Sequence, residues 1–126
     1  MISKHDIQTR TDIENLVNTF YRKVQQDDLI AHFFNEVVQL DWSKHIPVMY
    51  DFWESILLDK HNYKGNPMPA HVSLNEKSPM KKEHFDRWVL LFTATVDQLF
   101  TGEKADRAKT RALSIATVMQ IKIHKA

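Results

Sequence analysis

The chain has 126 residues, which fits one domain and leaves little room for a second. Its net charge is +1, from 17 basic and 16 acidic residues, so it lacks the one-sided charge that nucleic acids or anionic membranes attract. The absence of cysteine excludes disulfides, thiolate zinc sites and iron–sulfur clusters. The N-terminal residues contain no signal-peptide run and no stretch is long enough to span a membrane, so we expect a cytoplasmic protein.

Turn-forming residues are scarce. Gly65 and Gly102 are the only glycines, and all four prolines lie between residues 47 and 79. A sheet-rich fold usually needs more turn residues than this, so the composition favours an all-α protein. No linker or repeat divides the sequence, and we expect a single domain over residues 1–126.

The first predicted helix begins near Thr11. A hydroxyl at this position and a carboxylate at Glu14 have the spacing of a capping box. The pair Asp27-Asp28 interrupts the helix, and residues 29–34 then form one or two helical turns. Apolar residues recur at helical spacing along one face, at Ile13, Leu16, Val17, Phe20, Tyr21 and Val24.

A second helix is predicted from an N-cap at Asp41 to about Leu58. Pro47 falls inside it and should remove a backbone hydrogen bond and bend the axis. One side of this helix carries His45, Met49, Phe52, Trp53 and Ile56. A histidine at the head of an aromatic face can look into a ligand cavity, or it can be a partly exposed residue near a helix start.

Residues 59–78 form a long irregular segment, and such a segment in a compact domain usually serves a function. Pro67 and Pro69 stiffen it, with His71 two residues farther along. A histidine that binds a metal does so as a neutral imidazole that is held rigidly, and the stiffened segment suits His71 for such a role. The alternative is an ordinary surface histidine.

Two helices are predicted in the last third. The first has Ser78 as N-cap, begins at Pro79 and extends to Thr101, where Gly102 stops it. We expect His84 to lie on its solvated side. The second extends from about Lys104 to the C-terminus. Their apolar positions are Phe85, Trp88, Val89, Phe92, Val96, Leu99 and Phe100, then Ala105, Ala108, Ala112, Ile115, Ala116, Met119 and Ile123.

Several other kinds of site lack their motifs. A di-iron bundle needs two Glu-x-x-His pairs, and the sequence has none. The zinc motif HExxH, a glycine-rich phosphate loop and the Gly-x-Ser-x-Gly elbow are also absent. An ordinary four-helix bundle with aromatic core residues remains the structural alternative.

Several aromatic and histidine motifs occur in a defined order along the chain: Phe20-Tyr21, Phe33-Phe34, Trp42-x-x-His45, Phe52-Trp53, Tyr63-x-Gly65-x-Pro67, His71 and Phe85-x-x-Trp88. In this order and spacing the sequence resembles the group III truncated haemoglobins over roughly residues 12–123. The paired glycines typical of groups I and II are absent, which also favours group III.

The resemblance implies a shortened globin, a two-over-two helical sandwich around non-covalent haem b. It makes His71 the proximal iron ligand, with His84 as the competing candidate. Tyr21, His45 and Trp88 would face the gas ligand on the distal side. The haem pocket would include Phe34, His45, Met49, Phe52, Trp53 and Tyr63, with Tyr63 and Lys44 as candidates for contacting the propionates.

Three functions follow as hypotheses. The first is reversible binding of O₂, NO or CO at the haem iron. The second is NO dioxygenation or peroxide reduction at the same iron, which requires a separate reductase. The third is a haem-free helical module that binds a partner protein, and it leaves His71 without a role. Neither a nucleic acid nor a membrane is an expected partner.

Overall fold

The computed structural model describes residues 4–31, 42–58 and 81–125, apart from the side chains of residues 42–45 and 122–125. This part of the chain contains no strand, and the all-α prediction is confirmed. None of its helices is long and apolar enough to cross a membrane. The helices are α1 (Arg10–Gln26), α2 (Trp42–Leu57), α4 (Lys82–Leu99) and α5 (Glu103–Lys125).

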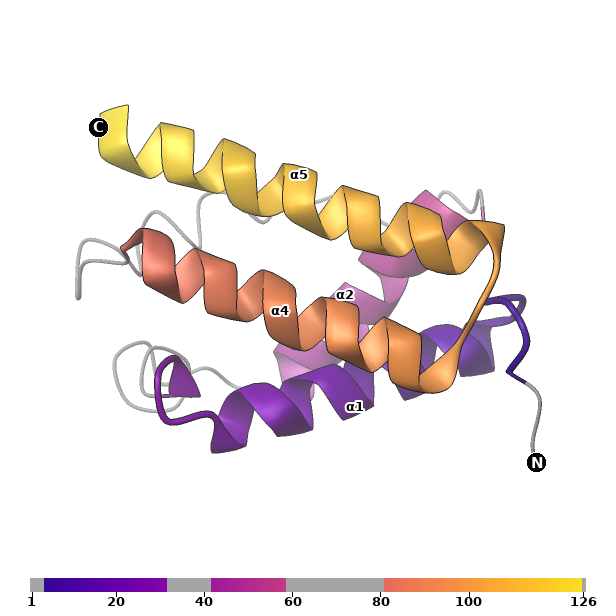
Figure 1. Ribbon diagram of the computed structural model, residues 1–126. Coiled ribbons are helices and arrows are strands. Elements are labelled where there is room, and N and C mark those ends of the chain that lie inside the picture. Colours follow the sequence, from indigo (N-terminus) through magenta and orange to yellow (C-terminus); the bar gives the residue numbers. More distant parts are fainter. Residues whose placement is uncertain (1–3, 32–41, 59–80, 126) are drawn as a thin grey trace.

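The helices are arranged as two pairs (Figure 1). Helix α4 packs along α5, and α1 packs against α2. Helix α1 also packs against α4, which joins the two pairs. The arrangement is the two-over-two sandwich that the sequence predicts, and its core is one cluster of buried side chains from all four helices.

Helix α1 begins two residues before the predicted capping box. Its N-cap is Thr9, whose side chain accepts a hydrogen bond from the Asp12 backbone N–H at 3.2 Å. The Asp12 carboxylate accepts the N–H of Thr9 in return, at 3.1 Å. The predicted start at Thr11 is therefore wrong, because Thr9 and Asp12 form the reciprocal pair two residues earlier. The predicted apolar face is confirmed, since all six of its residues are buried.

Asp27 ends α1 and links it to α4. Its side chain is 3% exposed and accepts the backbone N–H groups of Leu29 and Ile30 at 3.0 and 3.2 Å. It also accepts a hydrogen bond at 2.7 Å from Nε of Arg87 on α4. Burial raises the pKa of Asp27, but these hydrogen bonds outweigh it and hold the pKa below its usual value.

Helix α2 extends through Pro47, which lies inside the helix as predicted. It is joined to the start of α1 by Arg10, whose Nη1 contacts carboxylate oxygens of Asp51 at 2.8 Å and Glu54 at 3.0 Å. The guanidinium also lies 5.4 Å from the ring centre of Tyr50, within the range of a cation–π contact. These contacts fix the position of α2 across α1.

Helix α4 begins at Lys82, three residues after the predicted start at Pro79. Lys81 has an extended backbone (φ −97°, ψ 169°), so the helix does not extend back past this residue. His84 supplies the cap, because its Nδ1 accepts the N–H of Lys81 at 2.8 Å. His84 is buried, so its predicted solvated position is wrong. The capping role explains the burial, since the ring folds back over the helix start.

The turn between α4 and α5 depends on Asp6. Its carboxylate accepts the N–H groups of Lys104 and Ala105 at 2.9 and 2.8 Å, and so caps α5 from a distant part of the chain. Gly102 allows this approach. Its φ is +137°, and a Cβ added there would lie 2.6 Å from Cγ of Asp6.

Helix α5 lies close to α4 because its inner face is small. Four alanines on this face are at most 2% exposed, so little side-chain volume separates the backbones. The inward-pointing side chains become larger toward the C-terminal half, where Ile115 and Met119 join the alanines. The four alanines are Ala105, Ala108, Ala112 and Ala116.

We expect Asp6→Ala to lower the free energy of unfolding by about 1–2 kcal/mol, the usual cost of losing an N-cap. Urea unfolding of the purified protein measures this change. Asp6→Asn is the matched control, because its single amide oxygen can still accept one of the two N–H groups and should retain part of the stability. Equal losses in both variants would contradict the capping role.

Asp27→Asn should reduce stability at neutral pH by roughly 1–3 kcal/mol, because it removes a charge-assisted bond to Arg87 but keeps an acceptor oxygen. The pKa of Asp27 is lowered by folding, so its contribution is present above the unfolded value of about 3.9. It is lost as the pH falls through the folded pKa. Unfolding curves of both proteins should therefore converge in acid, and a gap that is constant with pH would refute this linkage.

Candidate functional site

An apolar cavity lies where the four helices meet. Its interior is small, with about 20 Å³ open to the centre of a water-sized molecule, which is room for about one such molecule. Every helix of the described part contributes to its wall. The lining residues are Tyr21 from α1; Met49, Phe52 and Trp53 from α2; Trp88 from α4; and Ile115 and Met119 from α5.

Tyr21 is the polar group that α1 brings to this cavity. Its position on the apolar face of α1 leaves it 6% exposed, with its ring 4.9 Å from that of Phe20. Burial raises the pKa of its hydroxyl far above the usual value. The hydroxyl therefore stays protonated at any ordinary pH and can act as a hydrogen-bond donor.

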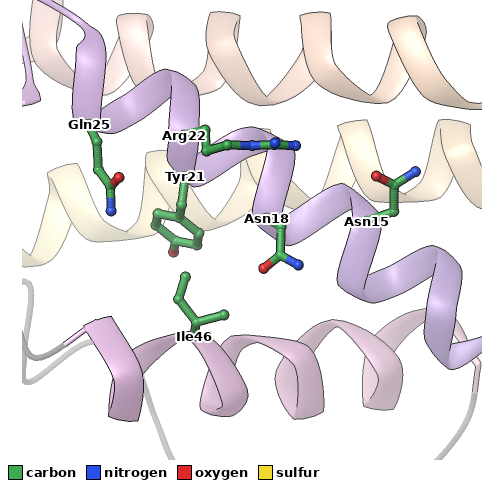
Figure 2. A pocket seen from close by; sticks show the side chains of 6 residues that line it. All are labelled: Asn15, Asn18, Tyr21, Arg22, Gln25 and Ile46. Atoms are coloured by element: carbon green, nitrogen blue, oxygen red, sulfur yellow. The ribbon is translucent and has the colours of Figure 1, made fainter.

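Tyr21 also borders a second, polar recess between α1 and α2 (Figure 2). In this view the side chains of Asn18, Tyr21 and Ile46 face the space between the two helices. Asn18 also accepts a hydrogen bond from the hydroxyl of Tyr50 on α2. The recess is lined by Asn15, Asn18, Tyr21, Arg22, Gln25 and Ile46. Tyr21 thus separates a polar surface recess from the apolar cavity.

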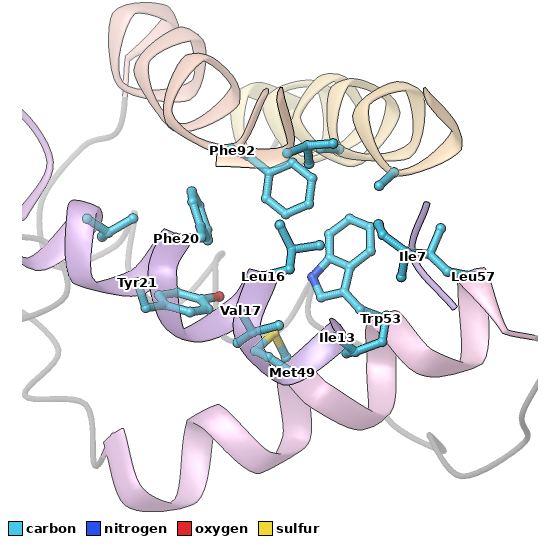
Figure 3. Close-up of a cluster of buried hydrophobic side chains, with 14 of the residues drawn as sticks. Ile7, Ile13, Leu16, Val17, Phe20, Tyr21, Met49, Trp53, Leu57 and Phe92 are labelled. Carbon is cyan, nitrogen blue, oxygen red and sulfur yellow. The ribbon is translucent and has the colours of Figure 1, made fainter. Parts of the chain in front are cut away.

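Trp53 holds the α2 side of the cavity in place (Figure 3). Its indole stacks on Phe92 of α4 with ring centres 4.7 Å apart and an interplanar angle of 21°. Phe52 contacts it edge-on at 5.3 Å. With 3% of its surface exposed, Trp53 has little freedom to rotate.

Trp88 continues this aromatic cluster on α4. Its ring is nearly parallel to that of Phe92, with centres 6.0 Å apart and an interplanar angle of 14°. It meets Phe20 of α1 edge-on at 5.6 Å. Trp88 is only partly buried, and its indole lines the cavity. The cluster of Phe20, Trp53, Trp88 and Phe92 therefore joins three helices around the cavity.

Five of the residues predicted for the site come together around this one cavity: Tyr21, Met49, Phe52, Trp53 and Trp88. Two other lining residues, Ile115 and Met119 on α5, were not predicted for the site. Both were predicted on the inner face of the last helix, and this periodicity is the only signal that could have found them. It does not distinguish a residue that packs against a neighbour from one that faces a cavity.

The remaining predicted residues lie outside the described part. Phe34, Tyr63 and His71 belong to segments that are not described, and His45 and Lys44 lie in α2 but without described side chains. Among described residues, no three histidine, cysteine, aspartate or glutamate side chains gather as a metal site. Iron ligation by His71 therefore stays a prediction from the resemblance.

Comparisons with known proteins agree with this geometry. Residues 5–124 match the bacterial-like globin family. The group 3 truncated hemoglobin ctb of Campylobacter jejuni is 27% identical over 125 residues, which cover 97% of this chain and 96% of that protein. The group 1 truncated hemoglobin GlbN of Synechocystis is 32% identical over 94 residues, 74% of this chain and 73% of that protein.

The fold agrees with a solved structure as well. A crystal structure of the group III truncated hemoglobin from Campylobacter jejuni matches this one with a TM-score of 0.81. The match covers 96% of this chain and 95% of the other, at 27% sequence identity. The chain therefore belongs to the bacterial-like globin family, and its predicted resemblance to the group III truncated haemoglobins is confirmed.

Proposed function

We propose that this globin binds haem b non-covalently and uses it to bind a diatomic gas such as O₂, NO or CO. The observation that carries the proposal is the buried Tyr21 hydroxyl, which stays protonated on the wall of an otherwise apolar, aromatic cavity. A cavity of this kind favours a small ligand that accepts a hydrogen bond. Family membership supplies the independent support for haem.

The described residues that line the cavity have the apolar character needed to pack against the distal face of a porphyrin. The cavity wall is aromatic and aliphatic, it is built from all four helices, and none of its described lining side chains is charged. A flat apolar macrocycle needs such a surface. Without cysteine, covalent attachment of the c type is excluded. By resemblance, Met49, Phe52, Trp53 and Phe34 would contact the ring, and Tyr63 and Lys44 its propionates.

By the same resemblance, His71 would hold the iron from the proximal side and His45 would lie near the distal opening. When bound, haem supplies a ferrous iron that binds diatomic gases reversibly. The protein's contribution is to exclude water and to aim donors at the gas. Tyr21 and Trp88 both line the cavity and carry an O–H and an N–H group.

Donors of this kind favour O₂ over CO, because bound O₂ carries more negative charge on its outer atom. A hydrogen bond to a charged group contributes about 1.5–3 kcal/mol. Two such bonds would slow O₂ release by orders of magnitude, which suits sensing or scavenging better than delivery. The same donors would polarise an O–O bond, so NO dioxygenation or peroxide reduction with a separate reductase is the second candidate.

Purified protein that contains haem should show a Soret band, and His71→Ala should lose most of it. Removal of the imidazole takes away the proposed iron ligand, and added imidazole should restore part of the band. His5→Ala is the control, because His5 is exposed at the surface. A folded, colourless protein that does not respond to added haem would refute the proposed function.

Tyr21→Phe should raise the O₂ dissociation rate roughly 10- to 100-fold, the equivalent of one hydrogen bond to a charged acceptor. Stopped-flow displacement of O₂ by CO measures the rate. The control is Tyr50→Phe, since the hydroxyl of Tyr50 bonds Asn18 beside the recess and lines no part of the apolar cavity. Similar rates in wild type and Tyr21→Phe would rule out this donor.

A further inference from the structure

Trp53 is only 3% exposed, and its indole N–H has no hydrogen-bond acceptor among the described residues. The described residues include no side-chain nitrogen or oxygen that is both fully enclosed and unpaired, so this nitrogen keeps some access to open space. Trp53 lines the apolar cavity, which is the open space beside it.

A donor in this position is unusual, because the N–H of a buried tryptophan normally finds a partner. An acceptor that enters the cavity can supply this partner. The ring cannot turn to find another acceptor, since Phe92 stacks on one face and Phe52 contacts it edge-on. The N–H group is thus held in a fixed direction before any ligand arrives.

The cavity offers donors and almost no acceptors. In Figure 3 the nitrogen-bearing edge of Trp53 faces the side where Met49 and the hydroxyl of Tyr21 lie. Trp88 adds a second indole to the same wall. Besides the Tyr21 oxygen, the described wall contains only the sulfur atoms of Met49 and Met119, which accept hydrogen bonds weakly. A ligand that suits this wall accepts hydrogen bonds and donates none.

We propose that Trp53 is a third ligand-binding donor, beside Tyr21 and Trp88, and that it increases the preference of the pocket for O₂ over CO. The inference rests on the proposed function and assigns a role to a residue that otherwise only walls the pocket. Because the indole is fixed by stacking, no side chain has to be reordered when the gas binds. The bond would form in the gas complex alone, where an acceptor is present.

The test compares Trp53→Phe with Val96→Ala. The first variant removes the N–H, whereas the second weakens the core of α4 without removing a donor or a cavity-lining residue. Trp53→Phe should raise the O₂ dissociation rate about three- to tenfold, the effect of one ordinary hydrogen bond. It should change the CO dissociation rate less than twofold and move the C–O stretching band to higher wavenumber. Val96→Ala should leave the ratio of the O₂ and CO rates near that of wild type.

A measurement on the wild-type protein keeps the proposal testable even if the Trp53→Phe variant does not fold. The chain has three tryptophans, so three indole N–H signals are expected in a proton–nitrogen NMR spectrum. Substituting Trp42 and Trp88 in turn assigns the signal of Trp53 by elimination. That signal should differ between the O₂ and CO complexes of the wild-type protein, in the direction of a stronger hydrogen bond with O₂.

The outcomes separate the two proposals. An unchanged rate ratio in Trp53→Phe, or an indole signal that is the same in both gas complexes, overturns the role of Trp53. If Tyr21→Phe still raises the O₂ dissociation rate, the gas-binding function stands without it. If Tyr21→Phe is silent as well, the distal pocket itself is wrongly assigned.

Discussion

The stacking of Trp53 on Phe92 is the contact on which the rest of the site depends. It joins α2 to α4 across the centre of the molecule, at 4.7 Å between ring centres. Phe92 is fully buried and also meets Phe20 edge-on at 5.1 Å, which brings in α1. A single ring therefore fixes three helices relative to one another, and the cavity wall takes its shape from their positions.

Rigid aromatic rings also explain why a cavity can persist here. Protein interiors are normally close-packed, and flexible side chains fill small gaps. Trp53 and Trp88 are held by Phe92 and Phe20, so neither can collapse inward without losing ring contacts. On the opposite wall, small alanines bring α5 close to α4 before Ile115 and Met119 open onto the cavity. Packing elsewhere in the core thus maintains an opening at this one place.

Much of the fold could be predicted from the sequence, because hydrophobic periodicity reports which face of a helix is buried. The four helices, the apolar face of α1 and Pro47 within α2 all follow from it. The exact residues at which the helices begin were harder to predict. Thr9 and Thr11 are equally good caps by residue type, and the choice is made by the reciprocal bond with Asp12.

The site shows the same limit. The buried cap formed by His84 could not be foreseen, because local sequence does not say whether a ring folds back over a helix end. The family resemblance named Tyr21 and Trp88 in advance, and their shared cavity is a tertiary result. Whether the indole nitrogen of Trp53 finds an acceptor depends on which side chains lie around it in the fold. No pattern along the chain indicates this.

The chemistry of the described donors has a further consequence for how the pocket responds to pH. Burial keeps the Tyr21 hydroxyl protonated, and an indole N–H does not ionise under any physiological condition. A histidine in the same place would change its hydrogen bonding near neutral pH. The described wall of the cavity therefore presents its donors regardless of pH. Under the proposed function, any pH dependence of gas binding would come from groups beyond this wall, and the donors would set affinity and selectivity.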